Sequence, residues 1–244
     1  MRGLSDREDA HGHAMWDFFR DGSGYEVVET ETGFIAPGTG PRLYFAEFKG
    51  WPRVEKQAIR LARGHVLDIG CGAGRCLLHL QAKGHDVTGI DTSPLAVKVC
   101  KKRGLKKTYV RSITEIGPDL GVFDTIIMFG GNFGLFGSFK RARWLLRRLY
   151  HMTSAEARLI VESRDPYDTD IPEHFEYHKF NRQRGRMSGQ LRLRVRYKKF
   201  KTPWFDYLIV SPDEMREILD GTGWAIKRIF PSSSGLYTAV IEKE

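Results

Sequence analysis

The sequence is poor in cysteine and has no long apolar run. Its three cysteines, Cys71, Cys76 and Cys100, form neither a Cys-x-x-Cys pair nor an even set, which argues against both a zinc site and a disulfide framework. No segment is long and apolar enough to cross a bilayer, and residues 1–14 are polar and charged, unlike a secretory leader. We therefore expect a cytoplasmic protein without a bound metal or a membrane partner.

Other signatures are missing as well. The chain has no internal repeat and no low-complexity tract, and it shows none of the RRM, KH or zinc-finger patterns of nucleic-acid-binding modules. A length of 244 residues lies within the range of one α/β domain with a full core. We therefore expect a single domain with attachments.

Residues 66–75, which read VLDIGCGAGR, combine an apolar run, an acid and three alternating glycines. The apolar residues suit a buried strand, and residues 76–82 restore a helical pattern. Between them, Gly70, Gly72 and Gly74 let the backbone approach a ligand closely and aim free N–H groups at it from the start of a helix. The segment therefore predicts a strand that leads into a nucleotide-binding loop.

A second strand is predicted over residues 85–91, and it too ends in a carboxylate, Asp91. Asp91 follows Asp68 by roughly 20 residues, which is the usual distance for an acid that holds an adenosine ribose. A carboxylate suits this role because it accepts hydrogen bonds from both ribose hydroxyls. The pattern indicates an adenosine derivative as the ligand.

Two cofactor classes share this geometry, and the loop favours one of them. The nicotinamide fingerprint is G-x-G-x-x-G, but Arg75 stands where its third glycine belongs. The chain instead has an acid, Asp68, before glycines at every second position. In this it resembles the class I S-adenosylmethionine-dependent methyltransferases, whose first motif is an acid followed by G-x-G-x-G. S-adenosylmethionine has no phosphate and carries an ammonium, which Asp68 would help to hold.

The resemblance implies a set of cofactor-binding residues. Asp91 would grip the ribose, and the side chain after it would lie along the adenine. Ser112 and Ile113 follow the third strand, at the position where the family usually has an acid near the adenine. Because that acid is missing, the resemblance implies an adenine contact here less strongly than it implies the first two motifs. The exit of the fourth strand would face the methyl group. The cofactor-binding residues implied are Asp68, Gly70, Cys71, Gly72, Gly74, Asp91, Thr92, Ser93, Ser112, Ile113 and Gly130.

The resemblance also implies an α/β fold. The sheet would be Rossmann-like, seven-stranded and mostly parallel, with helices on both faces and an antiparallel C-terminal strand. One domain would span residues 1–244, with an N-terminal lid over 1–53, core segments over 54–168 and 206–244, and a basic, β-rich insertion over 169–205. Further strands are expected at 108–116, 123–129, 158–163, 224–230 and 236–242, and helices at 140–152 and 212–221.

The lid is rich in aromatic residues, among which Tyr44 and Trp51 are candidates for contact with a substrate, although packing explains any single ring equally well. His11 and His13 are expected to be disordered or solvated. His174 and His178 share a helical face, but no third metal ligand is indicated, so a metal site is not favoured.

The net charge of +9 is concentrated in residues 182–201, which contain no acid. Within them, residues 191–198 alternate with period two, so the cations lie on one face of a strand and the apolar residues on the other. A solvated strand face is the simpler explanation. Recognition of a phosphate or carboxylate on the substrate is the alternative, and RNA is a partner that is not favoured.

The mechanism implied is in-line displacement of the methyl group by an N, O or S nucleophile of a small molecule, which needs positioning more than acid–base catalysis. Asn132 and His178 are the candidates for orienting the nucleophile or accepting its proton. Two alternatives stay open, namely a methyltransferase of RNA or protein, and a non-catalytic binding protein with the same fold. The predicted substrate contacts are Tyr44, Trp51, Asn132, Phe133, Arg164, Tyr167 and Tyr177.

Overall fold

The structure is a computed structural model that describes residues 3–38, 40–232 and 235–244. The helices are α1 (Ala10–Asp21), α2 (Pro41–Tyr44), α3 (Arg53–Ala58), α4 (Arg75–Ala82), α5 (Pro94–Lys102), α6 (Phe139–His151), α7 (Pro172–Gln183) and α8 (Pro212–Leu219). The strands are β1 (Val27–Thr30), β2 (Ile35–Pro37), β3 (His65–Ile69), β4 (Asp86–Asp91), β5 (Thr108–Val110), β6 (Phe123–Met128), β7 (Thr153–Arg164), β8 (Gln190–Tyr197), β9 (Phe200–Lys201), β10 (Phe205–Leu208), β11 (Trp224–Pro231) and β12 (Leu236–Lys243).

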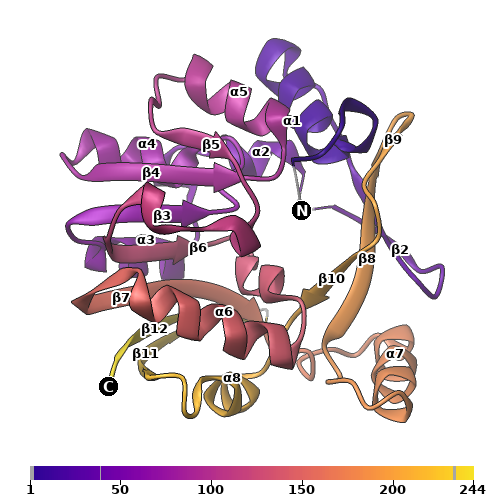
Figure 1. Ribbon diagram of the computed structural model, residues 1–244. Coiled ribbons are helices and arrows are strands. Elements are labelled where there is room, and N and C mark those ends of the chain that lie inside the picture. The colour runs from indigo at the N-terminus through magenta and orange to yellow at the C-terminus, as the bar shows by residue number, and fades with distance from the viewer. Residues whose placement is uncertain (1–2, 39, 233–234) are drawn as a thin grey trace. The chain divides into compact units, whose positions relative to one another are not determined.

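Among the described residues, seven strands form the larger sheet, in the order β11-β12-β7-β6-β3-β4-β5 (Figure 1). β3 pairs with β4, β4 with β5 and β6 with β7 in parallel, whereas β12 runs antiparallel between β7 and β11. This is the predicted α/β architecture with its antiparallel C-terminal strand, and the fold class is confirmed.

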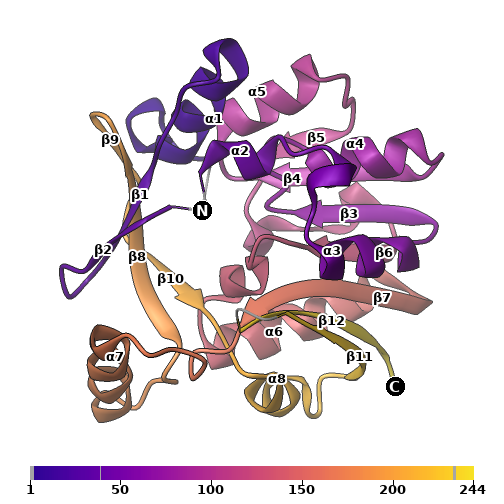
Figure 2. The same cartoon turned by 180° about the vertical axis from the view of Figure 1, so that it is seen from behind.

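The chain divides into two compact units. One holds the residues up to Trp51 together with Gly64–Leu120 and Leu193–Phe205, and the other holds Pro52–Arg63, Gly121–Arg192 and the residues from Asp206 onwards. In the first unit, α4 packs on β4, α5 packs on β4 and β5, and α1 packs on α5. In the second unit, α6 lies on the near side of β7 in Figure 1 and α3 on the near side in Figure 2, so helices cover both faces of these strands.

Burial explains why these segments are strands. β3 and β6 are nearly continuous apolar runs whose last four residues are buried, as expected for parallel strands covered on both faces. The expected strand over 158–163 is longer in the structure, as β7. The expected strand over 108–116 is shorter, because β5 ends at Val110 and a 3₁₀ turn, Ile113–Glu115, follows.

The second sheet joins segments that the sequence presents as separate attachments. Its order is β10-β8-β1-β2, with β9 paired to β8, so strands of the N-terminal segment pair with strands of the insertion. β1 pairs antiparallel with β8, with Val28 opposite Val195. The insertion also contains a helix, α7, and is therefore not purely β. No helix among the described residues has both the length and the apolar content that a membrane span needs.

Candidate active site

The predicted loop between β3 and α4 is shaped by its glycines. Gly72 has a φ of +52° and Gly74 a φ of +79°, in the left-handed region that glycine adopts at low cost. A Cβ on Gly74 would stand 2.4 Å from Leu105 Cδ1, so the close packing of the loop also requires a glycine there. The Cys100 thiol of α5 donates to the Gly72 carbonyl at 3.1 Å and so holds the loop against α5.

Asp91, at the end of β4, is bonded to the glycine loop. Its Oδ2 accepts from the Gly72 N–H at 2.9 Å, and its Oδ1 accepts from the Ser93 N–H at 2.9 Å. Ser93 in turn caps α5 by accepting from the Ala96 N–H. Burial raises the pKa of Asp91, although the two N–H donors oppose this. The acid of the second predicted motif thus contacts the glycine loop of the first motif within the first unit.

Asp68 is buried in β3, with 3% of its surface exposed. Burial raises the pKa of Asp68 to about 7, against the opposing charge of Arg75 and with a small contribution from Asp91. A carboxyl with such a pKa is partly protonated near pH 7, and a nearby positive charge would favour its ionised form.

The other predicted cofactor residues of this unit lie on neighbouring loops. Thr92 accepts at its carbonyl from the Leu4 N–H at 2.9 Å. Arg111 N–H donates to the Asp91 carbonyl, and Ser112 directly after it caps the 3₁₀ turn that begins at Ile113. Cys71 is buried, and its hydrogen bond with Cys100 and its burial raise the pKa of the thiol, which suits a space-filling residue. Binding of a cofactor by Thr92, Ser112, Ile113 and Cys71 stays a prediction.

Helix α1, in the segment expected to form a lid, packs on α5, which follows Asp91 in the chain. Asp9 caps α1, with Oδ1 accepting from the Gly12 N–H at 2.9 Å, while its Oδ2 accepts from the Leu95 N–H of α5 at 3.0 Å. His11 and His13, expected to be disordered or solvated, are ordered in α1. His13 stacks on Phe200 with the ring centroids 3.5 Å apart. That expectation was wrong because both histidines find partners far along the chain.

The two aromatic candidates of the lid occupy different surroundings. The Tyr44 hydroxyl donates to Glu26 Oε1 at 3.0 Å. Trp51 is only 3% exposed, its indole N–H donates to the Ala46 carbonyl at 2.8 Å, and the Arg75 guanidinium lies 4.7 Å from its ring centroid. Contact with a substrate stays a prediction for both residues, and Trp51 clearly contributes to packing.

In the second unit, the loop after β6 contains Gly130 and Gly131, both with positive φ. The Gly131 N–H donates to Glu162 Oε1 at 2.8 Å, and its carbonyl accepts from the Tyr207 hydroxyl at 2.6 Å. Asn132 begins the 3₁₀ turn Asn132–Phe136. Phe133 is fully buried and packs edge-on against Phe136.

The remaining candidates lie at the end of β7 and in α7. Arg164 ends β7, and Tyr167 is exposed, with its hydroxyl donating to Glu214 at 2.8 Å. Tyr177 and His178 are buried on α7, and the Tyr177 hydroxyl accepts from the Arg192 N–H at 3.1 Å. Burial lowers the pKa of His178, so its imidazole is mostly neutral at pH 7. Within the described part of the chain, no three His, Cys, Asp or Glu side chains are arranged to hold a metal ion.

The cations of β8 and Lys198 directly after it are paired with acids, and Arg196 and Lys198 are also exposed to solvent. Arg194 binds Glu29 of β1 with two hydrogen bonds of 2.7 and 2.8 Å, and Arg196 reaches the same carboxylate. Lys198 binds Asp17 of α1 at 2.7 Å. Apolar and cationic side chains alternate along β8 as expected. The acids that pair with these cations, Glu29 and Asp17, lie far away in the sequence, so the ion pairs link the insertion to the N-terminal segment.

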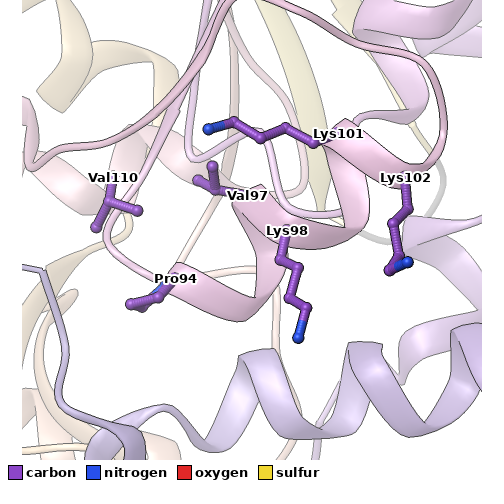
Figure 3. Close-up of a pocket in the computed structure, with 6 residues that line it drawn as sticks. All are labelled: Pro94, Val97, Lys98, Lys101, Lys102 and Val110. Carbon is purple, nitrogen blue, oxygen red and sulfur yellow. The ribbon is translucent and has the colours of Figure 1, made fainter.

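A surface pocket of about 460 Å³ lies on the outer face of α5 (Figure 3). Pro94, Val97 and Val110 supply its apolar atoms, and three lysines stand around them. None of the residues predicted to bind a cofactor or a substrate lines it. The lysines are Lys98, Lys101 and Lys102.

Comparison with known proteins shows what the chain is similar to. A family model described as a methyltransferase domain matches residues 66–154, which include the glycine loop and Asp91. Residues 66–154 are thus similar to methyltransferase domains. The solved structure of an S-adenosylmethionine-dependent methyltransferase from Bacteroides fragilis, in complex with S-adenosyl-L-homocysteine, superposes on this fold with a TM-score of 0.83. It is 23% identical, with 99% of this chain and 97% of that chain covered.

Curated proteins match the chain over shorter stretches. A protein of Geobacillus sp. (strain WCH70), provisionally named a methyltransferase, is 26% identical over 120 residues, which are 47% of this chain and 48% of that protein. The ubiquinone biosynthesis O-methyltransferase of Dechloromonas aromatica (strain RCB) is 38% identical over 76 residues, 29% of this chain and 33% of that enzyme. The matches thus span about half and a third of these relatives.

Several residues of the site escaped the sequence analysis. Asp9, His11 and Glu26 lie in a segment whose composition suggested only a lid, and no local pattern marks them. Tyr207 and Glu162 hold the loop after β6 from other strands. Their hydrogen bonds to Gly131 could not be predicted before the order of the strands in the sheet was known.

Proposed function

We propose that this protein binds S-adenosylmethionine and transfers its methyl group to an N, O or S atom of a small molecule. One observation carries the proposal. At the ends of two paired parallel strands, the Asp91 carboxylate and the glycine loop are bonded together through the Gly72 N–H. This arrangement, within a methyltransferase domain, suits a ligand with an adenosine ribose and no phosphate.

The residues present fit such a ligand. Asp91 keeps lone pairs for two ribose hydroxyls, since a carboxylate accepts about four hydrogen bonds and the loop uses two. Asp68, whose pKa is raised to about 7, would be stabilised in its ionised form by the ammonium of the ligand. The sulfonium of bound S-adenosylmethionine supplies an already activated methyl group. The protein then has to orient the acceptor and exclude water.

On the acceptor side, the Gly130 loop is held in place by Glu162 and Tyr207. We propose that Asn132, at the start of the following turn, orients the nucleophile. We propose His178 as a proton acceptor, because its lowered pKa leaves the imidazole neutral near pH 7. Phe133, Arg164, Tyr167 and Tyr177 remain proposed substrate contacts.

The ion pairs formed by the cations of β8 and by Lys198 favour a small-molecule acceptor over RNA. Arg194, Arg196 and Lys198 each pair with an acid of residues 1–53, which reduces the net positive charge that they offer to a phosphate backbone. One relative, the ubiquinone biosynthesis O-methyltransferase, bears a name that refers to a small molecule.

RNA is the second candidate acceptor, and the lysines of the α5 pocket favour it. The triple variant Lys98→Glu, Lys101→Glu, Lys102→Glu separates the two candidates. If RNA is the acceptor, an RNA-binding signal that weakens steeply with salt disappears in the variant. If the acceptor is a small molecule, the wild type gives no such signal.

Calorimetric binding of S-adenosylhomocysteine tests the proposed ligand. We expect the wild type to bind S-adenosylhomocysteine and not to bind NADH. Asp91→Ala should bind at least about tenfold more weakly, because the ribose loses its acceptor. Asp86→Ala is the matched control, since Asp86 begins the same strand and pairs with Lys107 at 2.7 Å. Binding of NADH, or equal affinity in Asp91→Ala, would contradict the proposal.

A further inference from the structure

The lysines of the α5 pocket differ from the cations at the end of the insertion. Arg194, Arg196 and Lys198 are each paired with an acid. Within the part of the chain that the structure describes, no acid forms an ion pair or a hydrogen bond with any of the three pocket lysines. Positive charge without a neutralising acid therefore surrounds this pocket.

One face of α5 builds most of the pocket. Its lining residues on the helix are three or four positions apart, so they share one face. Long side chains on a helix lean back over the preceding turn, which brings Lys98 over Pro94 and Lys101 over Val97. Figure 3 shows Lys101 extending back along α5 in the direction of Val97. The ammonium groups thus border an apolar floor, to which Val110 of β5 contributes a side chain that is 42% exposed.

Contacts from two other segments fix the walls of the pocket. The Lys98 Nζ lies 4.3 Å from the ring centroid of Trp16 on α1, a cation–π contact that holds this ammonium at the edge of the pocket. Gly3 lies so close to Val110 that a Cβ on it would stand 2.3 Å from the Val110 Cγ1. The Leu4 N–H next to it donates to the Thr92 carbonyl at 2.9 Å. The pocket is therefore formed by tertiary contacts and is more than the surface of one helix.

The opposite face of α5 belongs to the proposed adenosine site. There the Cys100 thiol donates to the Gly72 carbonyl, and Ala96 is buried in a cluster with Ala73. The residues that line the pocket do not include the glycine loop or Asp91. An occupant of the pocket would therefore leave the adenosine site open.

The composition of the pocket indicates the chemistry of its occupant. A volume of about 460 Å³ lies within the range of small-molecule sites, roughly 300–1,000 Å³. The lysines favour a negative group, and the apolar floor favours a ring or a short chain attached to it. A phosphate backbone would use only the lysines. A second copy of this chain on a two-fold axis would bring the same lysines against one another, which like charges oppose.

We propose that the α5 pocket is a second ligand site, which binds a small organic anion: an apolar body on Pro94, Val97 and Val110, with a sulfonate, phosphate or carboxylate among the three lysines. The inference goes beyond the proposed function and does not depend on it.

Two dyes that differ in one group test the proposal. Anilinonaphthalene sulfonate carries a negative charge, and phenylnaphthylamine has the same rings without it. Fluorescence titration at physiological salt should show one sulfonate dye bound per chain. In Lys98→Gln, Lys101→Gln, Lys102→Gln, its affinity should fall at least about fivefold, because three exposed charge contacts are lost. The affinity for the uncharged dye should stay unchanged in this variant.

The matched control removes three lysines elsewhere. Lys83→Gln, Lys106→Gln, Lys140→Gln changes the net charge equally, at exposed positions that do not line the pocket. It should keep the wild-type affinity for the sulfonate dye. Equal losses in the two triple variants, or no loss in the pocket variant, would overturn the inference. Near-ultraviolet circular dichroism verifies that both variants are folded.

NMR locates the bound dye. Adding anilinonaphthalene sulfonate should shift the amide resonances of Val97, Val110 and the last turn of α5, and saturating S-adenosylhomocysteine should not displace it. Shifts confined to the glycine loop would place the dye in the adenosine site and overturn the inference. Binding of poly(U) at physiological salt that requires the pocket lysines would assign the surface to RNA and also overturn it. If S-adenosylhomocysteine does not bind at all, the proposed function fails, whereas the dye titration still decides this inference.

Discussion

The Tyr207 hydroxyl donates a hydrogen bond of 2.6 Å to the carbonyl of Gly131, so strand β10 holds the loop that follows β6. The tyrosine ring also lies against Gly134, where a Cβ would stand 2.3 Å from the Tyr207 Cζ. Burial, with the charge of Glu162, raises the pKa of Tyr207, so the phenol remains a donor at any physiological pH. The loop proposed to face the acceptor is thus supported from beneath.

We expect Tyr207→Phe to lower stability by about 1–2 kcal/mol, because the Gly131 carbonyl loses its donor while the ring contacts remain. Chemical denaturation followed by circular dichroism measures this. Tyr109→Phe is the control, because Tyr109 is 43% exposed on β5. Equal unfolding free energies for the two variants would show that the bond to Gly131 contributes nothing.

The glycine loop gives a second prediction. Gly74→Ala should destabilise the protein by about 2–4 kcal/mol, because the new methyl group meets Leu105 and the positive φ is strained. Gly84→Ala is a matched control with a φ of +86° but open space around the Cβ position, and it should cost only about 1 kcal/mol. Equal losses, measured by urea denaturation, would mean that the contact with Leu105 relaxes freely.

Asp68 gives a prediction about pH and stability. Its folded pKa of about 7 exceeds the ordinary value of 3.8, so between these values the folded state binds more protons than the unfolded state. The contribution of Asp68 to stability is therefore present below about pH 4 and is lost as the pH rises towards about 7.

Accordingly, the difference in Tm between Asp68→Asn and the wild type should shift in favour of the variant as the pH rises from about 4 to about 7. Thermal denaturation of the ligand-free protein at several pH values measures it. The exposed Asp170→Asn serves as control and should run parallel to the wild type. A constant difference for Asp68→Asn would show that its carboxyl titrates normally.

The sequence predicts the part of the site whose requirements are local. The positive φ angles of Gly72 and Gly74, the apolar run before them and the acids at the two strand ends are all encoded within short segments. For that reason β3, β4 and α4 are found where they were expected, and the family resemblance rests on these residues and on Asp91. The C-terminal hairpin of β11 and β12 is predicted for the same reason.

Long-range pairing explains what the sequence could not show. The pairing of β1 with β8, and with it the bonds of Arg194 to Glu29, joins segments at opposite ends of the chain. A charge pattern reveals the cations of β8 but not the acids that neutralise them. His11 looked like a solvated residue, because its partner Glu26 is recognisable only after the lid has folded.

The central claim is methyl transfer from S-adenosylmethionine to a small molecule. The most direct test incubates the protein with S-adenosylmethionine labelled on its methyl group and with a cell extract separated into small molecules, RNA and protein. We predict that S-adenosylhomocysteine forms and that label enters the small-molecule fraction, and that Asp91→Ala lowers both. Label found only in RNA or protein, or no S-adenosylhomocysteine with any fraction, would contradict the account.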